Sequence, residues 1–178
     1  MAKLQNYNGR YCECEFEYTF LALLEEEGWQ YLAGNSIPRN SRREVLYSDD
    51  LEQFLSKTSP DLTADEIRQV MDTVRLAGAE SDFATLHKVY EWMVNGIQFT
   101  PQSGLARMVA LIDFEKPENN IFRAVNQFVV EYTNNGQTET RRPDVLLFVN
   151  GMPLCIIELK NPADEHATIY EAWEQINI

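Results

Sequence analysis

Two carboxylates and one ammonium group near the end of the sequence form a pattern that could hydrolyse a phosphodiester. Asp144 follows Pro143, and Glu158 and Lys160 come after an intervening run of thirteen residues. Carboxylates of this kind can hold one or two Mg²⁺ ions, which polarise a phosphoryl oxygen and lower the pKa of a bound water. A lysine beside them can position that water and neutralise charge in the transition state. The pattern therefore predicts a site for metal-assisted hydrolysis.

The spacing of Glu158 and Lys160 supports this interpretation without settling it. Residues two apart in a strand project from the same face, and Lys160 is the only one of the five lysines with an acid two residues before it. An acid followed at a distance by such a pair is nevertheless common by chance. A strand that reaches the surface and ends in polar residues would look the same. Spacing alone leaves both interpretations open.

The connection between the two acids adds a geometric condition. Asn150-Gly151 is typical of a two-residue hairpin turn. With that turn and regular pairing, Asp144 would lie opposite Ile157, and Glu158 would point to the other face. The two carboxylates can meet only if the hairpin contains one extra residue, either in a three-residue loop or in a β-bulge. We therefore predict such an irregularity between Asp144 and Glu158.

Hydrophobic periodicity predicts the elements that must position these residues. Helices are expected over about 14–27, 44–55, 64–76, 82–95 and 165–178, with Thr63 and Glu66 forming a capping box before the third. Strands are expected over 109–114, 122–132, 144–149 and 154–159. The last two are apolar on both faces, which predicts central strands covered on both sides. Helices followed by a mixed sheet and a final helix indicate an α/β fold.

Length and charge narrow the possible functions. The 178 residues fit a single domain, and 28 acidic against 15 basic side chains give a net charge of −13. No run of 18 apolar residues exists, so no membrane span is expected. Three cysteines without framework spacing predict a reducing, cytoplasmic location. A chain this acidic would bind DNA weakly by itself, so another component would have to supply most of the affinity.

Two basic clusters could still contact phosphates. Arg141 and Arg142 directly precede the predicted catalytic strand, so DNA contact and surface ion pairing are equally open there. Arg39, Arg42 and Arg43 form the other cluster. Ion pairing on an acidic surface is the better interpretation of that cluster.

The wider text around the acids resembles a known family. RRPDVLLFVNGMPLCIIELKNP, residues 141–162, is similar to the nuclease segment of the restriction (R) subunit of type I restriction–modification enzymes. Residues 111–132 resemble the strand pair ahead of that motif, and residues 17–29 resemble the opening helix of the family. The resemblance implies a PD-(D/E)xK restriction-endonuclease-like core, which is a mixed β-sheet flanked by helices.

The resemblance also implies roles for individual residues. Asp144 and Glu158 match the two metal-binding acids of the family, and Lys160 matches its catalytic lysine. Glu17 matches an acid of the first helix that can complete the metal site, although Glu13 and Glu15 are close competitors.

One further motif concerns the end of the sequence. Gln175 fits the first residue of a Gln-x-x-x-Tyr motif that gives catalytic support in the family. The matching tyrosine would fall one residue past Ile178. We therefore expect these residues to be the N-terminal part of a longer protein.

The function implied by the resemblance is that of a Mg²⁺-dependent endonuclease domain that cuts double-stranded DNA without reading its sequence. The expected partners are the modification (M) and specificity (S) subunits and the motor domains of the parent chain. ATP would serve the motor only, because these residues contain no phosphate-binding loop motif. The alternative is a non-catalytic acidic module that docks the motor onto partner subunits. The intact set of Asp144, Glu158 and Lys160 favours the nuclease.

Overall fold

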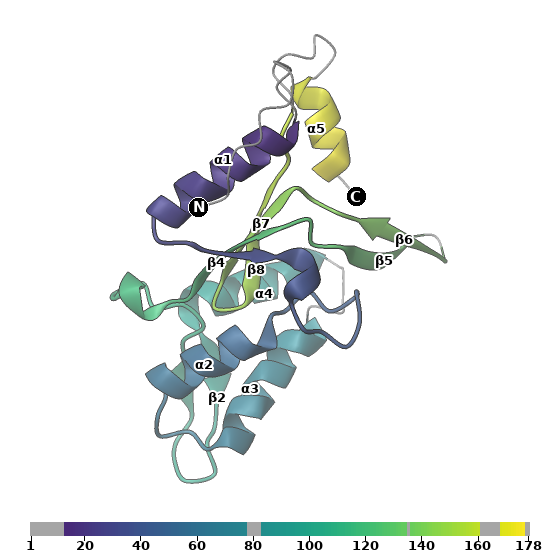
Figure 1. The fold of residues 1–178 in the computed structure, drawn as a ribbon. Coiled ribbons are helices and arrows are strands. Elements are labelled where there is room, and N and C mark those ends of the chain that lie inside the picture. Colours follow the sequence, from purple (N-terminus) through teal and green to yellow (C-terminus); the bar gives the residue numbers. More distant parts are fainter. Residues whose placement is uncertain (1–12, 78–82, 135, 161–167, 177–178) are drawn as a thin grey trace. The chain divides into compact units, whose positions relative to one another are not determined.

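The chain forms two compact units, and each combines segments that are distant in the sequence (Figure 1). A computed structural model describes residues 13–77, 83–134, 136–160 and 168–176. The first unit comprises Met1–Arg43, Phe122–Phe148 and Pro153–Ile178, and the second comprises Glu44–Ile121 and Val149–Met152. Among the described helices, none is long and apolar enough to cross a membrane.

A four-stranded mixed sheet forms the centre of the first unit. Its strand order is β1 (Gln30–Ala33), β4 (Phe122–Asn126), β7 (Val145–Val149) and β8 (Met152–Ile157). Strand β1 runs parallel to β4, and its residues 30–33 pair in register with residues 123–126. A mixed sheet with flanking helices confirms the predicted α/β fold and is consistent with a PD-(D/E)xK-like core.

Helix α1 (Glu13–Glu26) packs on one face of this sheet. Leu21 of the helix is buried and clusters with Ala124 of β4 and Val145 of β7. Gly28, two residues after the last helical residue, adopts a φ of 94°, which is a common conformation for a glycine at the end of a helix. The helix predicted over residues 14–27 is therefore confirmed, and its apolar stripe is what holds it against the sheet.

Strands β5 (Val130–Asn134) and β6 (Gln137–Arg141) form an antiparallel hairpin in the same unit. The prediction of one strand over residues 122–132 is wrong, because the run is divided between β4 and β5. Gln127 lies at the break with a φ of 52°, which interrupts the extended backbone. Strand β6 was not predicted, since its sequence QTETR has no apolar alternation.

The second unit is mainly helical. It contains α2 (Ser48–Thr58), α3 (Ala64–Ala77), α4 (Phe83–Asn95) and an antiparallel pair of short strands, β2 (Ile97–Phe99) and β3 (Arg107–Val109). Helices α2 and α3 lie side by side (Figure 1). Leu51, Phe54 and Val70 are completely buried in the core between these elements.

The predicted capping box at the start of α3 is confirmed. The backbone N–H of Thr63 donates to Glu66 Oε2 at 2.8 Å, and the N–H of Glu66 is 3.3 Å from Thr63 Oγ1. Glu66 is buried, and its other oxygen accepts a hydrogen bond from the Gln102 N–H at 2.8 Å. Hydrogen bonds hold the pKa of Glu66 below its usual value. The largest effect comes from the Thr63 N–H, followed by the Gln102 N–H and the Thr63 hydroxyl.

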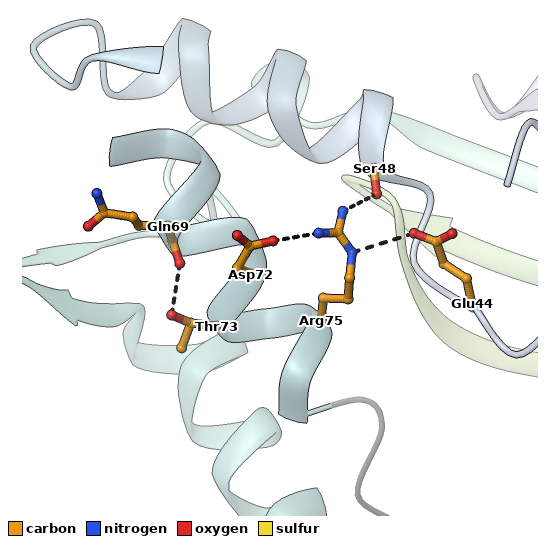
Figure 2. Close-up of polar contacts among 6 residues, drawn as sticks. All are labelled: Glu44, Ser48, Gln69, Asp72, Thr73 and Arg75. Atoms are coloured by element: carbon orange, nitrogen blue, oxygen red, sulfur yellow. Dashed lines mark hydrogen bonds and ion pairs between the residues drawn. The ribbon is translucent and has the colours of Figure 1, made fainter. Parts of the chain in front are cut away.

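Arg75 ties the last turn of α3 to the start of α2 (Figure 2). Its Nη1 lies 2.5 Å from Asp72, its Nη2 donates to Ser48 Oγ at 3.0 Å, and its Nε lies 3.5 Å from Glu44. The helix predicted from residue 44 therefore begins later, at Ser48. Tyr47 before it is extended, and Glu44 serves as an ion-pair partner instead of a helical residue.

Two predicted strands differ from the structure in their position. The strand predicted over 109–114 is wrong, because only Val109 of that range lies in a strand, β3. In the rest of the range, the carboxylate of Asp113 accepts backbone N–H groups two and three residues ahead and stabilises a turn. Strand β8 lies two residues earlier than predicted and is the edge strand of the described sheet. Leu154 and Ile156 are 42% and 44% exposed, so the prediction of a covered central strand is wrong for β8.

The C-terminal helix, predicted over residues 165–178, is present as α5 (Ile169–Ile176). Residues 161–167 and 177–178 lie outside the described residues.

Candidate active site

The sheet brings Asp144 against the segment that carries the other two predicted site residues. Asp144 directly precedes β7, and Glu158-Leu159-Lys160 directly follows β8. Oδ2 of Asp144 accepts a hydrogen bond from the backbone N–H of Leu159 at 2.7 Å. All four residues are partly buried. The aspartate is therefore bonded to the residue that lies between the predicted second acid and the predicted lysine.

The hairpin between β7 and β8 excludes one of the two irregularities that the sequence allowed. Asn150 and Gly151 form a two-residue turn with φ values of 50° and 78°, so there is no three-residue loop. Ile157, however, packs into the same cluster as Val145, although regular pairing would place these two side chains on opposite faces. This contact fits one extra residue in β8, the β-bulge alternative, which stays a prediction.

Helix α1 contributes a second carboxylate to this region. Oε1 of Glu17 accepts a hydrogen bond from Asn126 Nδ2 at 2.6 Å, and its Oε2 accepts one from Gln127 Nε2 at 2.8 Å. The same Nε2 of Gln127 lies 3.5 Å from Oδ1 of Asp144. Gln127 therefore bridges the acid of the helix and the acid before β7.

Asn126 and Gln127 were not identified by the sequence analysis, which placed them inside one long strand. A signal was present, because two adjacent amides interrupt the apolar run AVNQFVV. In a regular strand one of them would face the apolar interior, which is costly without a hydrogen-bond partner. Such a pair indicates a break in the strand, a buried polar site or both.

The backbone at this break is strained and closely packed. A φ of 52° at a non-glycine residue costs about 1–2 kcal/mol. The N–H of Gln127 donates to the carbonyl oxygen of Asp144 at 3.0 Å, which fixes the break beside the start of β7. Gly34 lies against it, since a Cβ there would come within 2.5 Å of the Asn126 oxygen and 2.7 Å of Phe128 Cα. The break therefore depends on the absence of a side chain at position 34.

Tyr31 of β1 completes the arrangement. Its hydroxyl donates to Asn126 Oδ1 at 3.1 Å. Burial, and then the nearby Tyr18, Glu17 and Glu25, raise the pKa of Tyr31 above its usual value. The phenol therefore stays protonated and remains a donor, which turns the amide nitrogen of Asn126 towards Glu17.

Comparison with known proteins identifies the family of this chain. The sequence model of the type I restriction enzyme R protein N terminus matches residues 14–178. The chain belongs to this family. It is 32% identical to the type I restriction enzyme HindI endonuclease subunit of Haemophilus influenzae, covering 92% of this chain and 16% of that protein. It is 34% identical to the putative MjaIXP endonuclease subunit of Methanocaldococcus jannaschii, covering 78% and 14%. The chain thus spans less than a fifth of these relatives.

The remaining residues that the R-protein resemblance singled out are only partly described. Glu17 of α1 is bonded to both amides, whereas the main-chain oxygen of Glu15 accepts a hydrogen bond from the Thr19 hydroxyl. The side chain of Glu13 lies outside the described residues. Gln175 belongs to α5, but its side chain lies outside the described residues. The helix predicted to carry Gln175 is therefore present, while the motif and the role of Gln175 stay predictions.

The basic cluster of Arg39, Arg42 and Arg43 contacts the β5–β6 hairpin and Phe128. Arg42 lies 3.6 Å from Glu131, and Arg43 Nη2 is 3.4 Å from the Thr138 hydroxyl. The guanidinium of Arg39 lies 4.1 Å from the centre of the Phe128 ring. These contacts support the interpretation of the cluster as a set of intramolecular partners.

The other basic cluster, Arg141 and Arg142, lies at the end of β6. Nε of Arg141 donates to the hydroxyl of Tyr132 at 3.2 Å, so this side chain is held within the hairpin. Arg142 is exposed and comes two residues before Asp144. Of the two, Arg142 is the better placed to contact a phosphate of a ligand at the site.

The donor set fits a magnesium ion better than a structural zinc ion. Asp144 and Glu17 offer carboxylate oxygens, the ligand type that Mg²⁺ prefers, and both lie against one amide group. Within the described ranges, no group of three or more His, Cys, Asp or Glu side chains could hold a metal ion. Magnesium is commonly held by one or two carboxylates, with water and substrate phosphates completing its shell. A closed zinc site would need four protein ligands.

Proposed function

We propose that this chain is the endonuclease domain of a type I restriction enzyme R subunit, and that it hydrolyses phosphodiester bonds of double-stranded DNA with Mg²⁺. The observation that carries the proposal is the hydrogen bond from the Leu159 N–H to Asp144, because Leu159 lies between Glu158 and Lys160 in the chain. The relatives are named as endonuclease subunits of type I restriction enzymes, which supports the same conclusion.

The residues would divide the chemistry as follows. Asp144 and Glu158 would hold the cation, with Glu17 as a third carboxylate. When bound, Mg²⁺ supplies a Lewis acid for the phosphoryl oxygen and lowers the pKa of a coordinated water. Lys160 would orient the attacking water and offset the negative charge that develops on the phosphate.

The proposal includes a division of labour with other components. The S subunit would read the sequence, the M subunit would modify it, and ATP-dependent motor domains of the parent chain would move the DNA in the cytoplasm. The domain itself would cut without sequence specificity. A net charge of −13 supports this division of labour, because an acidic chain has little affinity of its own for a phosphate backbone and needs other components to bind DNA.

A second candidate function is a non-catalytic acidic module that docks the motor onto partner subunits. Its support is the lack, within the described part of the chain, of three or more clustered metal-binding side chains. In that case Asp144 and Glu158 would have a structural role and would not share a cation. The two candidates therefore differ in metal binding.

Calorimetric titration with Mn²⁺, a common substitute for Mg²⁺, separates these candidates. The wild-type chain is compared with Asp144→Ala and Glu158→Ala, and with Glu52→Ala on α2 as a control for the loss of one exposed acid. We expect binding that Mg²⁺ displaces in the wild type and the control, and none in the two site variants. Equal weak binding in all four proteins would contradict the nuclease and favour the docking module.

A further inference from the structure

Two amide side chains hold Glu17, which comes to the site from a helix, whereas the other acids lie next to the ends of strands. Asn126 Nδ2 and Gln127 Nε2 donate to its two different oxygens, at 2.6 Å and 2.8 Å. Tyr31 fixes the orientation of the first amide by donating to its oxygen at 3.1 Å. Glu17 is therefore held at both oxygens by groups that carry no charge.

Gln127 also connects Glu17 with Asp144. Its Nε2 carries two hydrogens, and it lies 2.8 Å from the glutamate and 3.5 Å from the aspartate. A lysine or arginine in this place would form a salt bridge and compete with a cation for both carboxylates. An amide donor holds the carboxylates near each other and leaves their negative charge for a metal ion.

The backbone supports this role for the side chain. Gln127 has a φ of 52°, a conformation that glycine adopts freely and that other residues rarely adopt. Its N–H is bonded to the carbonyl oxygen of Asp144 at 3.0 Å, and Gly34 packs against the flanking backbone. A glutamine at such a position indicates that its side chain offsets the strain through the bonds it makes.

We propose that Gln127, assisted by Asn126, is a positioning residue that keeps Glu17 and Asp144 within reach of one metal ion. This inference rests on the proposed function, because it requires a cation at Asp144. Two neighbouring carboxylates repel each other when both are ionised. Without the amide donor, Glu17 turns towards water and the site loses one acid. Loss of a residue that orients metal ligands commonly lowers metal affinity by about 10–100-fold.

The test uses Gln127→Gly, which removes the amide but suits the backbone conformation. Mn²⁺ affinity is measured by calorimetry, and the unfolding temperature is measured in the presence of a chelator. We expect Gln127→Gly to unfold near the wild-type temperature and to bind Mn²⁺ about 10–100-fold more weakly. Gln127→Leu, which keeps the side-chain bulk, should show the same loss of affinity. Gln137→Leu, a matched change at an exposed position of β6, should bind as the wild type does.

A double-mutant cycle with Glu17→Gln tests the route of the effect. In the Glu17→Gln background, Gln127→Gly should cost little further affinity, because the ligand that it positions has already been neutralised. A full additional loss in that background would overturn the inference, as would wild-type affinity in Gln127→Gly. In both cases, Mn²⁺ binding that depends on Asp144 and Glu158 would leave the proposed function standing. Absence of Mn²⁺ binding in the wild type would overturn both.

Discussion

At the scale of single residues, buried polar side chains connect segments that are distant in the sequence. Asn150 is completely buried, donates to the Leu111 carbonyl oxygen and to Asn120 Oδ1 at 2.8 Å each, and accepts the Ile121 N–H at 2.8 Å. A turn that the sequence already predicts is thereby tied to a distant loop. Asn126 and Gln127 act in the same way on Glu17.

Glu66 provides a test of this kind of bonding through pH. Its pKa is lowered in the folded chain, chiefly by the Thr63 N–H, so its ionised form stabilises the fold. That contribution is present above the pKa of the unfolded chain, near 4.5, and is lost as the pH falls through the lower folded pKa. We therefore expect Glu66→Gln to be less stable than the wild type at pH 7 and to approach it at acidic pH.

Urea unfolding between pH 3 and pH 7 measures this difference. Glu52→Gln, a change at an exposed position of α2, controls for the loss of one negative charge. A stability difference between Glu66→Gln and the wild type that stays constant across the range would show that the bonds to Glu66 do not favour its ionised form.

At the scale of elements, the site depends on the point at which β4 ends. If the backbone stayed extended beyond Asn126, the amide of Gln127 would not be directed towards Glu17. The left-handed residue Gln127 instead separates β4 from β5 and turns its amide to Glu17. Gly34, which follows β1, lies directly against this break. The parallel pair of β1 and β4 therefore positions the site as well as the sheet.

Substitution Gly34→Ala tests this dependence. Its Cβ would meet backbone atoms of Asn126 and Phe128 at 2.5–2.8 Å, and backbone cannot give way as a flexible side chain can. We expect a loss of about 1–3 kcal/mol of stability, as in other overpacked interiors, together with weaker Mn²⁺ binding. Gly104→Ala is the matched control, because nothing lies within 4 Å of the added atom. Unchanged stability and metal affinity in Gly34→Ala would contradict the proposed role of this contact.

At the scale of the whole molecule, charge sets how the domain would meet DNA. With a net charge of −13, non-specific DNA affinity depends on a few local arginines and not on the overall field. Arg42 and Arg43 contact residues of the β5–β6 hairpin. The exposed Arg142 is therefore the better candidate for a contact with a DNA phosphate. Most of the affinity would then come from the rest of the assembly.

DNA binding at varied salt concentration tests this view. We expect the chain to bind double-stranded DNA with a Kd no tighter than about 10⁻⁶ M, measured by fluorescence anisotropy in Ca²⁺ to prevent cleavage. Arg142→Ala should weaken binding and reduce the slope of log K against log salt by about 1. Arg68→Ala, an exposed arginine on α3, should leave both unchanged. Equal effects of the two substitutions would argue against a phosphate contact at Arg142.

The sequence by itself determined the features that depend on neighbouring residues. The limits of α1, the capping box of Thr63 and Glu66, the turn at Asn150-Gly151 and the acid-x-lysine pattern all follow from local spacing and local hydrogen bonds. The family resemblance then indicated which acids to consider. These features are readable because their energetic causes lie within a few residues of chain.

Only the tertiary structure decided the features that depend on distant contacts. Gln127 breaks a strand because Gly34 and Asp144, far away in sequence, accommodate the break. Among the several acids of α1, Glu17 is the residue assigned to the site because the amides of Asn126 and Gln127 donate hydrogen bonds to its carboxylate. Such choices minimise buried, unsatisfied polar groups across the whole fold, and that balance is set by which elements pack together and not by local spacing.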